Sequence, residues 1–274
     1  MTNWTGAIRL NNHAVALMEG GGAENDGAIV HFLQEAVVVL QHAIQEEMGS
    51  EAFSAQGRTE DEHCDIITGA NEATIEFSSR RIRCFQDPEF FLFDLAFLLF
   101  ENNDDARTGF ISKGRDRKSW VEMQSSIVLF NLGLTFHRRA LLRYRHQQQH
   151  PQDYDVVLRQ NTQVLFSKSK LLYTMSSKIL VELVDNGSRI NNDLFRSTKF
   201  ALRLGIANNM AHIAVVEDPT RAYESHFMQQ VAQLIEEGTS KKAATTLSFT
   251  ILSGIMMNII SQNESISHWL AAAA

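Results

Sequence analysis

The sequence predicts a mainly α-helical fold. Apolar residues recur at three- and four-residue spacing through most of the 274 residues, which is the period of an amphipathic helix. Alternation with the two-residue period of a strand is confined to one region, at about 50–118. The composition, 44% hydrophobic and 21% charged with only 3 Pro, is typical of a globular protein. We therefore expect a single domain, 1–274, built from helical hairpins around a strand-bearing insertion.

The first hairpin is predicted at about 10–45. Three apolar residues mark one face of its first helix: Leu10, Ala14 and Leu17. The glycines at 20–22 end that helix. A second apolar stripe then begins with Ala28, Phe32 and Ala36. Two helices joined by a glycine turn are expected to pack against each other through these stripes.

The insertion is predicted at about 50–118, where helical spacing is lost. Ala73–Phe77 and Arg81–Phe85 alternate apolar and polar residues, which predicts two short strands. The run Phe90–Phe100 is ambiguous, because its length suits a short buried helix and its aromatic content favours a strand.

The second hairpin is predicted at about 119–185, and its first helix, Ser119–Arg145, is the most informative stretch of the chain. One apolar face contains Leu129, Leu132 and Phe136. Gly133 lies in that face. A glycine inside a helix costs about 1 kcal/mol relative to alanine, so we expect a packing reason, namely the close approach of a second helix. That second helix is predicted over Val156–Leu183.

The third hairpin is predicted at about 194–237, followed by a C-terminal segment, 245–274. The stretch Ala207–Ala214 echoes the second hairpin, with Ala211 in the place of Gly133. An asparagine comes two residues before the small residue in each first helix: Asn12, Asn131 and Asn209. In the C-terminal segment, Leu247–Ile260 is compatible with a helix or a strand, so a β contribution there is left open.

These patterns resemble tetratricopeptide (TPR) repeats, over about half of the chain. The resemblance is carried by two groups of residues: Leu132, Gly133 and Phe136 in a first helix, and Ser169, Tyr173 and Ser176 in a second. The chain is also similar to TPR-like proteins of single-celled algae of the diatom type, which share strand-bearing insertions and an Ala-rich end. The resemblance implies an α–α superhelix whose concave groove, lined by first helices, binds a partner's peptide or helix.

The candidate partner-binding residues lie beside the apolar stripes of two first helices: Asn131, Thr135, Arg138, Arg139, Asn208, Asn209 and His212. The alternative is an ordinary solvated helix face. Arg138 and Arg139 begin a basic run that extends to His150. Because guanidinium groups match carboxylates, this run suits an acidic peptide. The alternatives are a phosphate-rich ligand and pairing with carboxylates of the chain itself.

Several classes of partner and location are disfavoured. A net charge of −7 supplies no basic field for nucleic acid. The most apolar runs are shorter than the roughly 20 residues of a membrane-spanning helix, and the N-terminus has no signal-peptide pattern. Cys64 and Cys84 have neither disulfide-framework numbers nor metal-site spacing. We expect a cytoplasmic protein without nucleic-acid or membrane partners.

No catalytic constellation is visible. The histidines lack a Glu or Cys at zinc-site spacing, and the glycines at 20–22 lack the Lys-Ser/Thr of a phosphate loop. We therefore predict a non-catalytic scaffold or adaptor, without metal or cofactor, that binds a protein or peptide. Two alternatives remain: an enzyme with its site in the 50–118 insertion, and a structural subunit of a larger complex. The partner's identity and the oligomeric state are left open.

Overall fold

The computed structural model describes residues 4–20, 25–54, 86–87, 90–91, 93, 96–99, 115–150, 156–185, 193–218, 226–240, 255 and 258. This part of the chain forms six helices: α1 (Trp4–Gly20), α2 (Asp26–Ser54), α3 (Arg115–Gln149), α4 (Val156–Asp185), α5 (Asp193–Glu217) and α6 (His226–Ser240). Two short strands, β1 (Gln86–Asp87) and β2 (Phe90–Phe91), pair antiparallel, with Gln86 opposite Phe91. The prediction of a mainly helical fold is confirmed.

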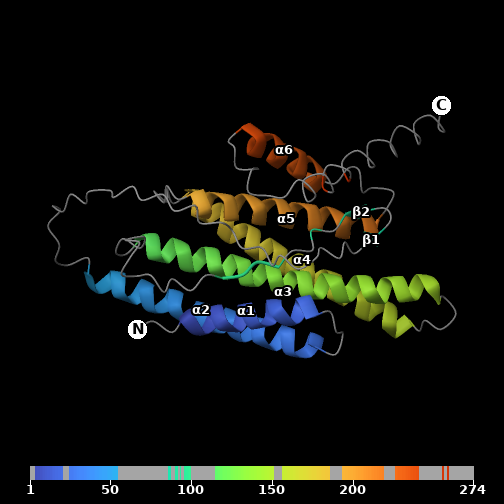
Figure 1. Cartoon of the computed structure of the whole chain (residues 1–274), viewed down its shortest axis with the longest axis horizontal. Coiled ribbons are helices and arrows are strands. Elements are labelled where there is room, and N and C mark those ends of the chain that lie inside the picture. The colour runs from blue at the N-terminus through green and yellow to red at the C-terminus, as the bar shows by residue number, and fades with distance from the viewer. Residues whose placement is uncertain are drawn as a thin grey trace.

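The helices pack in consecutive pairs. α1 lies against α2, α3 against α4, and α5 against α6. Neighbouring pairs meet through α2 with α3 and through α4 with α5, so the pairs follow one another in chain order (Figure 1). α1 and α5 also contact α3, which places α3 at the centre of the molecule. TPR geometry for these pairs stays a prediction.

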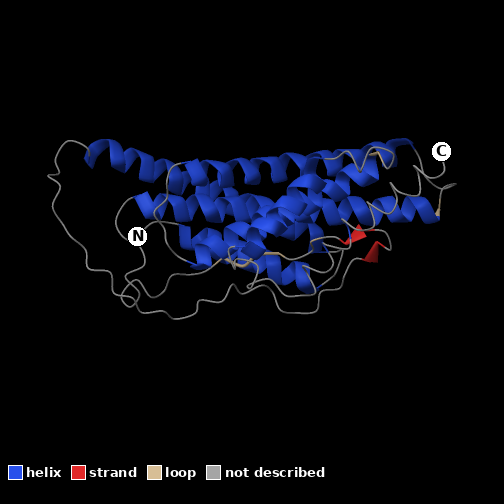
Figure 2. Ribbon diagram, turned by 90° about the horizontal axis from the view of Figure 1, so that it is seen from above, coloured by secondary structure: helices blue, strands red, loops and turns tan. Residues whose placement is uncertain are grey.

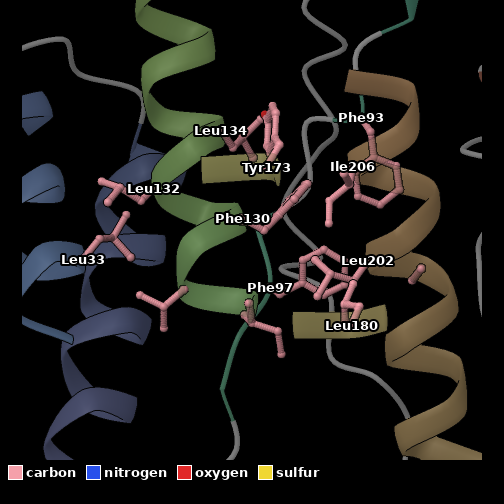
Figure 3. Close-up of a cluster of buried hydrophobic side chains, with 14 of the residues drawn as sticks. Leu33, Phe93, Phe97, Phe130, Leu132, Leu134, Tyr173, Leu180, Leu202 and Ile206 are labelled. Carbon is pink, nitrogen blue, oxygen red and sulfur yellow. The ribbon is translucent and has the colours of Figure 1, made fainter. Parts of the chain in front are cut away.

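The central helix α3 is buried around its whole circumference. Every residue from 123 to 137 is buried. In the close-up of Figure 3, Leu132 points toward Leu33 of α2, while Phe130 points to the other side, where its ring packs against that of Phe97. The apolar face predicted at Leu129, Leu132 and Phe136 is therefore only one part of a helix that has neighbours on all sides.

Gly133 allows the predicted close approach of a second helix. A Cβ atom added at Gly133 would lie 2.9 Å from Cε1 of Tyr173 on α4. On the same face of α4, the Ser169 hydroxyl donates to the Gly133 carbonyl at 2.8 Å. One turn further, the hydroxyls of Ser176 and Ser126 are 2.8 Å apart. The small–aromatic–small spacing of α4 thus matches the contact surface of α3.

The ambiguous run Phe90–Phe100 is extended where it is described. β2 opens it, and Phe93 and residues 96–99 continue without helical structure. The strands predicted at Ala73–Phe77 and Arg81–Phe85 lie outside the described residues. In the C-terminal segment the two described residues, Ile255 and Asn258, are both helical and buried.

One described helix is long and apolar enough to cross a membrane, by length and composition alone. It is α2, over Asp26–Glu46, with a mean hydropathy of 1.4. A core helix of a soluble protein and an N-terminal signal sequence share these properties. In this fold α2 contacts α1 and α3. Its buried face consists of Ile29, Leu33, Ala36, Leu40 and Ala43. The expectation of no membrane partner stays a prediction.

Candidate functional site

The candidate site is the face on which α1, α3 and α5 jointly hold an extended piece of the chain. We call this piece the crossing segment and define it as Phe93 together with residues 96–99. Figure 1 shows it running from β2 across the helices, and Figure 2 shows the strands outside the helical layer on one side. Each of the three helices contributes an asparagine that makes two hydrogen bonds to the main chain of this segment, and α1 contributes a second asparagine, Asn11, that makes one.

Each asparagine contacts both main-chain polar groups of a single residue. The Asn209 carboxamide accepts from Phe93 N and donates to Phe93 O, both at 3.0 Å. Asn131 accepts from Phe97 N at 3.0 Å and donates to Phe97 O at 2.8 Å.

Asn12, on α1, makes the same pair of bonds with Leu99. Its carboxamide accepts from Leu99 N at 2.8 Å and donates to Leu99 O at 2.7 Å. A carboxamide offers one acceptor and two donors, so it gives one residue what a neighbouring strand gives in a hydrogen-bonded pair. We call these three two-point contacts the asparagine clamps.

The spacing of the clamped residues follows from strand geometry. In an extended chain the N–H and C=O of one residue point to the same edge, and those of the next residue point to the opposite edge. Phe97 and Leu99 are two positions apart in a continuously described stretch, so both present their polar groups to the same edge. The clamps therefore satisfy main-chain groups that would be costly to bury without partners.

Further hydrogen bonds hold the clamping carboxamides of Asn131 and Asn209. The buried Asn11 donates to Phe97 O at 3.0 Å and accepts from Asn131 at 2.9 Å. Asn209 also donates to the Tyr173 hydroxyl at 3.1 Å. The bonds to Asn11 and Tyr173 help to fix the orientation of the Asn131 and Asn209 carboxamides, in addition to their bonds with the crossing segment.

Asn208, next to the clamp of α5, connects this face to the C-terminal segment. Asn208 accepts from the Asn258 carboxamide at 2.8 Å. Both side chains are buried, so the bond replaces contacts with water for two polar groups inside the core.

The aromatic side chains of the crossing segment are buried in the helical core. Phe93 and Phe97 have exposed fractions of 0% and 2%. Phe97 packs edge-on against Phe130 of α3, with ring centroids 5.4 Å apart, a geometry that aromatic pairs prefer. Phe93 lies over Gly205 of α5, where an added Cβ would come within 2.8 Å of its ring. The helices thus hold the side chains as well as the main chain.

A buried histidine pair lies beside the clamp of Asn209. His137 Nδ1 is 3.4 Å from the Tyr173 hydroxyl, and the rings of His137 and His212 have centroids 5.2 Å apart. Burial, with a smaller contribution from His212, lowers the pKa of His137 well below its usual value. His137 is therefore neutral at physiological pH. Within the described ranges, no three His, Cys, Asp or Glu residues are arranged to hold a metal ion.

The structure separates the sequence-predicted site residues into two groups. Asn131 and Asn209 contact the crossing segment directly, and Asn208 and His212 are buried beside them. Thr135 is also buried, and its hydroxyl donates to the Asn131 carbonyl at 2.9 Å. For these five residues, the alternative of a solvated helix face is wrong.

The basic residues form the second group and face another element. Arg139 Nε lies 3.1 Å from Asp26 Oδ2 at the start of α2. Burial raises the pKa of the Asp26 carboxyl above its usual value, and the charges of Arg139, Arg138 and Arg143 act against that rise. Arg139 therefore pairs with a carboxylate of the chain itself, which is one of the alternatives for the basic run.

Comparison with known proteins adds no relative. No family model, curated protein or solved structure matches this chain.

Sequence reasoning missed Asn11, the role of Asn12, and the crossing segment as their occupant. A signal for the clamps was present, because Asn12, Asn131 and Asn209 share one position relative to a small residue. Nothing in that spacing indicated what the asparagines would hold.

Proposed function

We propose that this chain is a non-catalytic interaction scaffold, a TPR-like adaptor of the cytoplasm, that binds a partner as an extended peptide. The binding surface is the face formed by α1, α3 and α5. One observation carries the proposal: three carboxamides on three helices each make a two-point contact with the main chain of one extended segment.

The clamps suit peptide recognition because they address groups that every peptide has. N–H and C=O are present at each residue other than proline, so a clamp requires an extended conformation and not a particular side chain. Each hydrogen bond contributes only about 0.5–1.5 kcal/mol net, but three clamps act along one line. Asn131 and Asn209 are also held by Asn11 and Tyr173, so little side-chain freedom is lost on binding.

The chemistry of this face favours binding over catalysis. Carboxamides neither take up nor release protons in the physiological pH range, so Asn131 and Asn209 offer hydrogen bonds without acid–base function. The nearby His137 is held neutral by burial, which suits a packed core position more than a proton-transfer role.

The test is capture of partners from the source cells with photo-cross-linking. A cross-linking residue is placed at Ala16, which is exposed one turn after Asn12 on α1. The matched control places it at Asn161, which is exposed on α4. We expect a recurrent, stoichiometric partner that cross-links from position 16 and not from position 161. Cross-linking from position 161 alone, or no recurrent partner at all, would refute the proposal.

A further inference from the structure

The crossing segment already occupies the clamped face. The asparagines that hold it are distant from it in sequence. The residues of the crossing segment lie 34, 87 and 116 positions from Asn131, Asn12 and Asn209. Every clamp contact is a hydrogen bond to main chain, so none of them depends on a covalent connection between segment and helices. A segment from another molecule would satisfy the same donors and acceptors.

We propose that the crossing segment is an exchangeable, self-supplied ligand. The partner that replaces it is a protein segment with aromatic residues at its first and fifth positions and an aliphatic residue at its seventh, Phe-x-x-x-Phe-x-Leu. This inference rests on the proposed function and names the ligand class of the same face.

The side-chain preferences follow from the two aromatic slots. The clamps read only main chain, so selectivity comes from what surrounds the side chains of Phe93 and Phe97. The first slot is open because residue 205 is glycine, and the Phe93 ring fills the space that a Cβ would occupy. In the second slot Phe97 packs on Phe130, and its ring centroid is 6.1 Å from that of Phe93. A segment without these rings would leave both slots unfilled.

Competition sets the apparent affinity. A partner segment binds only the fraction of molecules whose face is vacant, so apparent affinity falls as the crossing segment holds more tightly. A change that weakens the crossing segment alone must therefore strengthen binding in trans. A substitution in a clamp weakens the binding of both the crossing segment and the partner segment, so it is less informative. Tighter binding of the partner segment after a substitution in the crossing segment indicates exchange, whereas weaker binding indicates damage to the fold.

The first experiment uses a labelled synthetic peptide with the sequence of residues 90–99, flanked by lysines for solubility. Its binding to the full chain is measured by fluorescence anisotropy. We expect the Phe97→Ala variant to bind it at least tenfold more tightly than the wild-type chain. The control is Leu98→Ala, next in sequence at a half-buried position outside the clamps, with a change of less than threefold. Equal or weaker binding by Phe97→Ala, with unchanged helical circular dichroism, would overturn the proposal.

A second measurement avoids substitutions in the core, in case Phe97→Ala does not fold. Protease sites are introduced into the full chain within Glu60–Glu62 and Asn102–Asp105, and the folded protein is then cleaved at both. We expect the released piece to remain bound and to exchange with the labelled peptide. A peptide with alanine in place of Phe93 and Phe97 should exchange at least tenfold less. Failure of the labelled peptide to exchange after cleavage would contradict the proposal.

Two other outcomes overturn the ligand assignment specifically. Equal exchange of the alanine peptide would remove the aromatic specificity, and a dimer formed by reciprocal exchange would make a second copy the occupant. Neither outcome changes the cross-linking result from position 16. Loss of that cross-link would instead remove the proposed function, so the two failures are distinguishable.

Discussion

Replacing Asn131 by leucine removes the central clamp while keeping a side chain of similar size. Asn131 accepts from Phe97 N at 3.0 Å, donates to Phe97 O at 2.8 Å, and donates to Asn11 at 2.9 Å. Asn11 still donates to Phe97 O after the change. The groups that lose the partner supplied by Asn131 are the Phe97 amide and the Asn11 carboxamide oxygen.

The expected cost follows from burial. Asn131, Asn11 and Phe97 have exposed fractions of 0%, 0% and 2%, so water does not replace the lost contacts. A buried polar group left without its partner, as the Asn11 carboxamide oxygen would be, costs about 1–3 kcal/mol, and loss of the hydrogen bond to the Phe97 amide adds to that cost. That is a large share of the roughly 5–15 kcal/mol that stabilises a typical folded domain.

Chemical denaturation followed by circular dichroism measures this loss, and hydrogen exchange localises it. We expect Asn131→Leu to lower the midpoint without changing the slope, and the Phe97 amide to exchange faster than the Phe93 amide held by Asn209. The same substitution at the exposed Asn161 should change the free energy of unfolding by less than about 0.5 kcal/mol. A loss below about 1 kcal/mol at Asn131, or unchanged protection of Phe97, would refute the clamp argument.

Three further perturbations test the packing around the clamps. Gly133→Val should lower the free energy of unfolding by about 1–3 kcal/mol in a denaturant titration, because its side chain would meet Tyr173 at 2.9 Å. Gly205→Ala should destabilise the wild-type chain, since its Cβ would meet the Phe93 ring at 2.8 Å, and a double-mutant cycle with Phe93→Leu should recover most of that loss. His137 is protonated less readily in the folded than in the unfolded chain, so its contribution is complete above the usual pKa of 6.5 and is lost as the pH falls. As the pH falls below 6.5, unfolding titrations should show a loss of stability that is absent in His137→Gln.

The controls use positions without these contacts. Gly6 lies in α1 with nothing within 4 Å of an added Cβ, so Gly6→Ala should be neutral or stabilising by up to about 1 kcal/mol.

An unchanged midpoint in Gly133→Val would argue against the close contact of α3 and α4. If the losses in free energy of unfolding from Gly205→Ala and Phe93→Leu are additive, the two residues do not interact. Equal pH slopes in both His137 proteins would assign the titration to other groups.

Local features of the sequence were sufficient to predict the helices. The spacing of apolar residues and the residues that end helices predicted helices in the three hairpin ranges. A helix needs only apolar residues at three- and four-residue spacing and a stop signal. Gly133 and the small–aromatic–small series of α4 indicated a close helix contact, since a glycine inside a helix is unfavourable without a packing reason. Asn131 and Asn209 were recognised as special for a similar reason: both repeat at one position relative to a small residue.

Only the tertiary structure decided what those asparagines do. The apolar run Phe90–Phe100 is compatible with a helix or a strand by its own period, and where it is described it is not helical, with asparagine clamps from three helices on its main chain. Those clamps come from residues 34, 87 and 116 positions away, beyond the range of any local pattern. A carboxamide also has the same sequence signature on a solvated surface, in an open groove and inside a core. The sequence determined which helices form and where asparagines recur, and long-range packing decided that they hold a segment of the chain itself.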